Sequence, residues 1–280
     1  QQWKGLLDFV DPREYAYQAL WSVGTYLHHL FNTFPYEYIG GVRRVGKSKT
    51  LAVQSCLAFN AIFSDNMSSA SLYRLIQNAK ATLLIDETEK LSNPERCQEF
   101  RSLLLGGYKK GTRVYRVEKN RKEQLTPEPF EIYSPKALAN INGIEDVLED
   151  RCKLTILKRG RNSTILDREV DFENPVWAKL RDGLYRFYLS YWREVKACYE
   201  AFNVLSVRSE LVHLLNDHGC QVTETDLRLL TGRELEIWRP ILALGLFFDS
   251  QKVLSSKYTS TLNAPSTLPD SILDAMVELA

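Results

Sequence analysis

The chain has 280 residues, of which 44% are hydrophobic and 25% charged, and its formal net charge is +1. This length suffices for one large domain or for a core with a smaller second region. The near-neutral charge excludes a uniformly basic coat for nucleic acid. The longest apolar run, 241–248, is too short to cross a bilayer, so we expect a cytoplasmic protein with no membrane partner. Because the chain begins with Gln1, we expect a piece of a longer polypeptide.

Predicted helices and strands alternate through the first 158 residues. A helix opened by Asp11 and Pro12 is followed by a strand over 34–39. Helices are then predicted over 47–63, 71–77, 94–105 and 144–151, and strands over 82–85, 112–117, 130–140 and 153–157. Such alternation predicts an α/β core with a mainly parallel sheet.

The remaining residues have a different pattern. Apolar residues at helical spacing from Val176 to Val195 predict a long amphipathic helix, and further helices are predicted over 205–215 and 235–248. Residues 253–270 are rich in Ser, Thr and Pro, which is typical of a linker. We therefore expect a core over 1–160, an all-helical lid over 161–252, and a linker with a terminal helix over 253–280.

A glycine-rich loop follows the predicted strand over 34–39. It has the pattern G-x-x-x-x-G-K-S, and a predicted helix begins within it. Glycines let backbone N–H groups approach phosphates, and the helix N-terminus adds partial positive charge. Lys47 is expected to reach the β- and γ-phosphates of ATP, and Ser48 to hold Mg²⁺. The predicted ATP-binding residues are Gly41, Val42, Arg43, Arg44, Val45, Gly46, Lys47, Ser48 and Lys49.

Two acidic residues end the predicted strand over 82–85. Asp86 is expected to bind Mg²⁺ through water, and Glu87 to orient and polarise the attacking water. The alternative is a strand end that only turns polar. Because these acids lie about 40 residues beyond the phosphate loop, as a Walker B pair does, the sequence favours the catalytic interpretation.

The predicted strand over 135–140 ends in Asn140. In P-loop ATPases with an additional strand between the two Walker strands, a polar residue at this point positions the attacking water. Asn140 fits this sensor 1 role best, and Asn142 is the second candidate. A turn asparagine before Gly143 is the structural alternative.

Arginines provide two further candidates. Arg151 precedes the last core strand, where an arginine finger stabilises the γ-phosphoryl group of a neighbouring subunit. The alternative is a salt bridge with Glu149 or Asp150. Arg233 lies in the lid, where a sensor 2 arginine reaches the γ-phosphate, and its alternative is a salt bridge or a packing role with Glu236.

A basic stretch separates the Asp86–Glu87 pair from Asn140. Seven positive charges lie within fourteen residues, on a predicted hairpin with its turn at 119–122. We expect these cations to contact DNA phosphates, with binding that weakens steeply with salt. The alternative is a solvated hairpin. The residues are Lys109, Lys110, Arg113, Arg116, Lys119, Arg121 and Lys122.

Several short segments resemble a family of uncharacterised ATPase domains common in plasmid and phage replication proteins. Besides the loop, they include 71–76, 105–111, 134–139, Asp150-Arg151 and 233–240. The resemblance covers about residues 10–160 and 225–250. The motif order is also similar to superfamily three and minichromosome-maintenance helicases. The chain departs from the pattern at Val45, where many relatives have a small residue, and at Lys49, where they have Ser or Thr.

The resemblance implies an AAA+-like P-loop ATPase core that works with ATP and Mg²⁺ as a homo-oligomer, as a hexameric ring, on single-stranded or forked DNA. It also implies association with a primase-polymerase module. The leading hypothesis is a DNA motor of the replicative helicase type. The alternatives are an ATP-dependent switch in initiation, loading or defence that does not translocate, and a module that binds ATP only to assemble.

Overall fold

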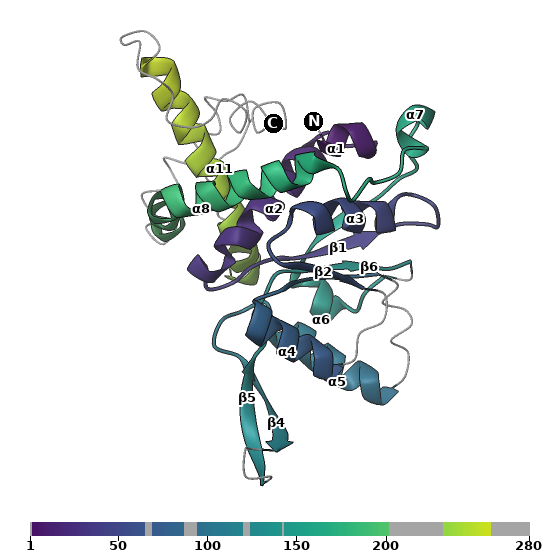
Figure 1. Ribbon diagram of the computed structural model, residues 1–280, viewed down its shortest axis with the longest axis vertical. Coiled ribbons are helices and arrows are strands. Elements are labelled where there is room, and N and C mark those ends of the chain that lie inside the picture. Colours follow the sequence, from purple (N-terminus) through teal and green to yellow (C-terminus); the bar gives the residue numbers. More distant parts are fainter. Residues whose placement is uncertain are drawn as a thin grey trace.

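A computed structural model describes residues 2–64, 69–86, 94–119, 124–141, 143–201 and 232–258. Its centre is a parallel five-stranded sheet with the order β2-β3-β6-β1-β7 (Figure 1). The strands are β1 (Tyr36–Gly40), β2 (Ala61–Ser64), β3 (Thr82–Ile85), β6 (Lys136–Ala139) and β7 (Cys152–Ile156). Parallel strands need crossover connections, which the helices provide. The predicted α/β class with a parallel sheet is confirmed.

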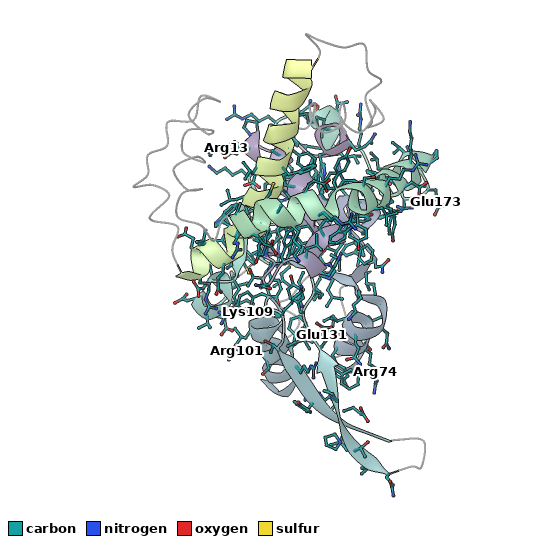
Figure 2. All side chains as sticks on the ribbon, turned by 90° about the vertical axis from the view of Figure 1, so that its left-hand side faces the viewer. Arg13, Arg74, Arg101, Lys109, Glu131 and Glu173 are labelled. Carbon is teal, nitrogen blue, oxygen red and sulfur yellow. The ribbon has the colours of Figure 1, made fainter. Side chains whose placement is uncertain are left out.

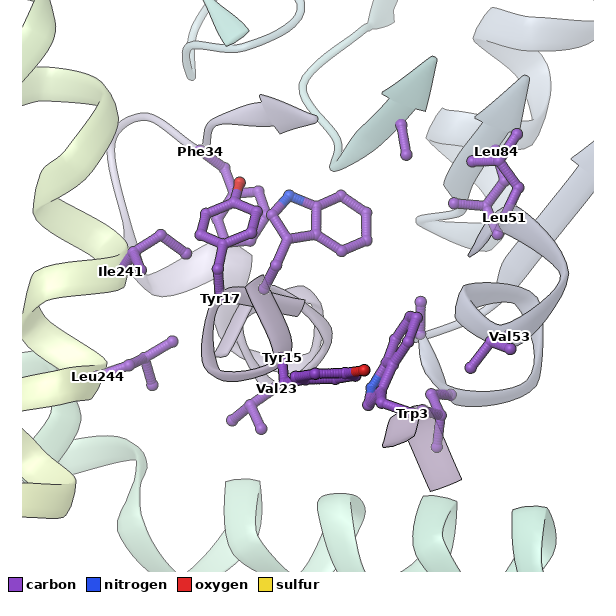
Figure 3. Close-up of a cluster of buried hydrophobic side chains, with 14 of the residues drawn as sticks. Trp3, Tyr15, Tyr17, Val23, Phe34, Leu51, Val53, Leu84, Ile241 and Leu244 are labelled. Atoms are coloured by element: carbon purple, nitrogen blue, oxygen red, sulfur yellow. The ribbon is translucent and has the colours of Figure 1, made fainter. Parts of the chain in front are cut away.

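One face of the sheet is covered by helices from both ends of the chain (Figure 1). These are α1 (Gln2–Leu6), α2 (Arg13–Leu27), the 3₁₀ helix η1 (His28–Leu30), α3 (Lys47–Leu57), α8 (Pro175–Ala201) and α11 (Gly232–Tyr258). A single cluster of buried side chains joins Val23 of α2 and Leu244 of α11 to Leu84 of the sheet (Figure 3). Helices α8 and α11 therefore share a core with the sheet.

The other face carries α4 (Ser69–Ala79), α5 (Pro94–Gly106) and α6 (Asp146–Glu149). Leu72 and Ile76 of α4 pack with Tyr36 and Tyr38 of β1 in a second buried cluster. Because successive strand residues point to opposite faces, β1 contributes Ile39 to the first cluster and these two tyrosines to the second.

An antiparallel hairpin, β4 (Arg113–Lys119) and β5 (Leu125–Glu131), extends away from the body (Figure 1). Its base is fixed by Phe130, whose ring centroid lies 4.5 Å from that of Tyr73 on α4. The hairpin was predicted, but its second strand begins earlier than expected. Pro127 and Pro129 within β5 conceal it, since proline reduces the strand signal.

Three further boundaries differ from prediction. The helix expected over 47–63 ends at Leu57, and β2 follows a turn in which Asn60 has a φ of 43°. The stretch over 130–140 divides between β5 and β6, which belong to different sheets. Helix α11 continues to Tyr258, into the predicted linker. The short helix α7 (Ser163–Leu166) was not expected. Uniformly apolar runs such as 61–63 give no period that separates helix from strand.

No helix within the described residues has both the length and the apolar content needed to cross a bilayer. The predicted helix over 205–215 lies outside the described residues. The boundaries at residues 160 and 252 remain predictions.

Candidate functional site

The glycine-rich loop connects β1 to α3 at the carboxyl edge of the sheet. Gly41 has a φ of 139°, and a Cβ added there would lie 2.6 Å from the carbonyl oxygen of Leu157. Gly46 caps α3 with a φ of 99°, and Arg44 between them has a φ of 64°. Positive φ angles at these three positions give the loop a backbone conformation that glycine adopts more readily than other residues. It leads directly to the helix N-terminus, where anions are stabilised.

Lys47 folds back over this loop. Its Nζ donates hydrogen bonds to the carbonyl oxygens of Gly41, at 2.8 Å, and Val42, at 2.9 Å. Its side chain is thus fixed within the loop. Ser48 is exposed in the first turn of α3. Both lie at the helix N-terminus, as the sequence predicted.

The order of the strands brings other predicted residues to the same edge. Strand β6 lies between β1 and β3, which confirms the expected additional strand. Asn140 follows β6, is buried, and donates its backbone N–H to the carbonyl of Ile39 at 3.3 Å. Asp86 follows β3, and its N–H bonds to the carbonyl of Ser64 at 3.2 Å. Since carboxyl ends of parallel strands share one edge, the loop, Asn140 and Asp86 lie side by side.

The rest of the loop divides into exposed and buried residues. Val42, Arg43 and Arg44 are exposed, whereas Val45 is buried in the first core cluster. Lys49 turns away from the loop and donates a 2.8 Å hydrogen bond from Nζ to the carbonyl of Ile165 in α7. Burial lowers the pKa of Lys49. This lysine therefore connects the loop helix to α7.

A cavity of about 200 Å³ adjoins the loop. Its walls come from the loop, from the segment after α1 and from the segment after β7. Lining residues include Leu7, Phe9, Gly46, Lys158, Arg159 and Asp167. Asp8 fixes the last two segments together, because its Oδ2 accepts hydrogen bonds from the N–H groups of Arg161, at 2.6 Å, and Asn162, at 2.9 Å. Sequence patterns did not reveal this cavity, because the two segments that face the loop lie far from it in the chain and carry no motif.

Arg151 and Arg233 lie at the opposite, amino edge of the sheet. The carbonyl of Arg151 accepts a hydrogen bond from the N–H of Tyr36, the first residue of β1. The five residues of β1 separate this edge from the loop by about 16 Å. The structure therefore does not bring either arginine to the loop of its own chain.

Both arginines lie close to one tyrosine ring. The guanidinium carbons of Arg151 and Arg233 are 5.3 Å and 5.4 Å from the ring centroid of Tyr108. Arg151 also donates to the carbonyls of Leu105 and Val147 rather than to Glu149 or Asp150. Arg233 forms a 3.0 Å ion pair with Asp150, and not with Glu236 as the alternative had it.

The basic residues expected on the hairpin separate into two groups. Lys109 lies on the body of the molecule (Figure 2), where it forms a 3.0 Å ion pair with Glu236. Lys110 donates to the carbonyl of His29. Only Arg113 and the residues after it are on the hairpin. Arg113 is exposed, while Arg116 lies 5.6 Å from the ring centroid of Tyr73.

The exposed face of the hairpin is largely apolar, which the charge pattern did not indicate. Tyr115, Val117 and Leu125 are all more than 60% exposed. Tyr115 lies opposite Pro129, and Val117 opposite Pro127. The alternation of Tyr115 and Val117 with charged residues could have predicted this apolar face. The many neighbouring charges led us to expect a basic surface instead.

Four predicted site residues lie outside the described residues: Glu87, Asn142, Arg121 and Lys122. Lys119 ends β4, and only its backbone belongs to the part of the chain that the structure describes. No cluster of three or more His, Cys, Asp or Glu side chains in the described ranges is arranged to hold a metal ion. Mg²⁺ in phosphate sites is usually held by only one or two protein side chains together with phosphates and water.

Comparison of the chain with protein-family models and with curated proteins finds no match in either set.

Proposed function

We propose that this chain is an ATPase of the P-loop type that binds ATP with Mg²⁺ at the carboxyl edge of its sheet. The observation that carries the proposal is the loop between β1 and α3. Its glycines adopt positive φ angles, and Gly41 lies where a Cβ would meet the Leu157 carbonyl. Backbone N–H groups at such a loop and helix N-terminus form an anion site.

Each side chain at this edge has a chemical role in the proposal. Lys47, already held across the loop, exchanges its bonds with Gly41 and Val42 for phosphate oxygens. Ser48 and Asp86 hold Mg²⁺, which supplies Lewis-acid stabilisation of phosphate charge. Glu87 accepts a proton from the attacking water, and Asn140 orients that water. The cavity beside Gly46 receives the nucleoside.

The hydrolytic site is completed by a second copy of the chain. Arg151 and Arg233 are at the edge of the sheet opposite to the loop of their own chain, and both guanidinium groups lie beside the ring of Tyr108. Such fixed cations can stabilise transition-state charge in a neighbouring subunit. A homo-oligomer in which the arginines of one copy reach the loop of another would satisfy this requirement.

We further propose that ATP turnover is coupled to DNA, as in a replicative helicase module. The hairpin supports this, because it projects from the body (Figure 1). Arg113 and Tyr115 on its first strand are exposed. Aromatic rings stack with bases and cations contact phosphates in single-strand binding. Lys109 and Lys110 are excluded from this surface because their ammonium groups bond within the body.

The test is ATP turnover with and without single-stranded DNA. We expect Lys47→Ala to abolish nucleotide binding, and Glu87→Gln to bind ATP but lose turnover. Stimulation by DNA supports the coupling, and strand displacement on a forked duplex separates a motor from a switch. ATP binding without hydrolysis by the unaltered oligomer would contradict the ATPase proposal and leave an assembly module.

A further inference from the structure

Strand β7 is the terminal strand of the sheet among the described residues. The N–H of Tyr36 bonds to the carbonyl of Arg151, and the N–H of Leu157 bonds to the carbonyl of Gly40. Residues 151, 153, 155 and 157 therefore direct their backbone groups to β1. By alternation, the N–H and C=O groups of Cys152, Leu154 and Ile156 point to the open edge. A row of such groups is a template for another strand.

The same edge exposes apolar side chains. Leu154 is 37% exposed and Ile156 is 59% exposed, although both are in the strand itself. Leu154 lies in an open groove with Cys152, whose other walls are α6 and the first turns of α11. Soluble proteins usually protect a terminal strand with charges or a covering segment. An apolar edge of this kind indicates an association surface.

The ends of β7 carry opposite charges. Asp146, Glu149 and Asp150 are exposed just before the strand, and Glu234 of α11 lies on the same groove. Asp150 is already paired with Arg233. Lys158, Arg159 and Arg161 follow the strand. This edge is thus acidic at one end, apolar in the middle and basic at the other end.

We propose that two copies of the chain pair antiparallel along β7, with the two-fold axis at Leu154. Antiparallel pairing about Leu154 places the end of β7 that follows Glu149 and Asp150 beside the end that precedes Lys158 and Arg159 in the second copy. The two-fold axis repeats this acidic-to-basic contact at both ends of the pair. Leu154 is the middle residue of β7 and faces outward, so an axis there lets all three outward-facing residues form hydrogen-bonded pairs, 154 with 154 and 152 with 156. Two-fold interfaces are self-complementary in this way.

The pairing has a consequence for the site, which rests on the proposed function. It sets Arg151 opposite Leu157 of the second copy. The carbonyl of Leu157 lies against Gly41 at the start of the phosphate loop. Arg151 of each copy would then approach the loop of the other copy. This arrangement differs from a ring, in which the contact is head-to-tail and not two-fold.

Disulfide trapping tests the axis without reference to ATP turnover. In a chain carrying Cys152→Ser, we expect Leu154→Cys to give a cross-linked dimer on mild oxidation, since hydrogen-bonded antiparallel partners have Cα atoms about 5.5 Å apart. Ile156→Cys in the same background is the matched control. Position 156 faces 152, so two cysteines at 156 lie too far apart to join. The Cys152→Ser parent measures background from the other cysteines.

Charge exchange tests the alignment. We expect Glu149→Lys and Arg159→Glu each to raise the dimer dissociation constant about tenfold or more in sedimentation equilibrium, and the double variant to restore association. Three results overturn the proposal: a monomer at all concentrations, cross-linking at 156 but not at 154, or a head-to-tail oligomer that forms normally in the charge variants. A chain that shows no ATP turnover but cross-links at position 154 would contradict the proposed function and still support the pairing along β7.

Discussion

The carbonyl oxygen of Leu157 lies so close to Gly41 that a Cβ at position 41 would come within 2.6 Å of it. Leu157 follows β7 and Gly41 follows β1, and the N–H of Leu157 donates a 2.8 Å hydrogen bond to the carbonyl of Gly40. Two neighbouring parallel strands thus fix the entrance of the loop. The loop therefore depends on β7 as well as on its own glycines.

Gly41→Ala should displace the loop. The methyl group meets backbone, which cannot move as a flexible side chain can, and the φ of 139° is unfavourable for alanine. We expect loss of ATP binding and roughly 1–3 kcal/mol of destabilisation, measured by titration with a fluorescent ATP analogue and by urea unfolding. Gly245→Ala in α11 is the control, because nothing lies within 4 Å of its added Cβ. Unchanged nucleotide affinity in Gly41→Ala would contradict the role of the loop.

Arg151→Ala should lower ATP turnover by roughly a thousandfold or more while ATP affinity changes little. The reason is that Arg151 is at the opposite edge from the loop of its own chain. Mixing Arg151→Ala with Lys47→Ala chains should restore part of the turnover. Sites that combine the loop of one variant with the arginine of the other are then complete. Turnover that stays at the level of the separate variants would show that the site is not shared.

Glu37 should make stability depend on pH. Burial raises the pKa of Glu37 to about 7, against weaker opposing effects of Lys153 and of hydrogen bonds from Gln18 and Gln54. Because the pKa of Glu37 is raised in the folded state, its contribution to the free energy of unfolding is complete below about pH 4.5. That contribution is lost as the pH rises through 7. The change is on the order of 3 kcal/mol.

Urea unfolding of Glu37→Gln at pH 5 and pH 8 checks this expectation. At pH 8 the variant should have a higher free energy of unfolding than the wild type. At pH 5 the two free energies should be similar. His28 has the opposite pH dependence, because burial lowers its pKa to about 4. Its contribution to the free energy of unfolding is lost as the pH falls from 6.5 toward 4. Equal pH profiles for Glu37→Gln and the wild type would mean that Glu37 is ionised in the folded protein.

Removal of a positive charge should change DNA binding when the charge is on the hairpin, but not when it is on the body. Charge reversal at Arg113, Lys119, Arg121 and Lys122 should weaken single-stranded DNA binding and flatten its salt dependence by about 0.7 for each phosphate that is no longer bound. Tyr115→Ala should weaken binding with little change in that slope, because stacking does not release counterions. Lys109→Ala should leave the slope unchanged, since this lysine is paired with Glu236. The measurement is fluorescence anisotropy over a series of salt concentrations.

Local patterns predicted the elements that form the site edge. The strand over 82–85 matches β3, and the glycine-rich loop lies between a strand and a helix, because hydrophobic runs and glycines act over a few residues. Prediction was weaker where apolar runs have no period, as at 61–63, and where Pro127 and Pro129 interrupt β5. The hairpin charges were overestimated because ion pairs between distant residues, such as Lys109 with Glu236, leave no trace in sequence.

The sequence by itself determined the α/β class, the loop from Gly41 to Ser48, and the polar residues Asp86 and Asn140 that follow strands. Each of these depends on short-range periodicity and backbone conformation. Only the tertiary structure decided which strands are neighbours, that Arg151 and Arg233 share Tyr108 at the far edge from the loop, and that β7 ends the sheet of the described residues. Those relationships follow from the packing of helices on both faces of the sheet, which joins residues more than a hundred positions apart.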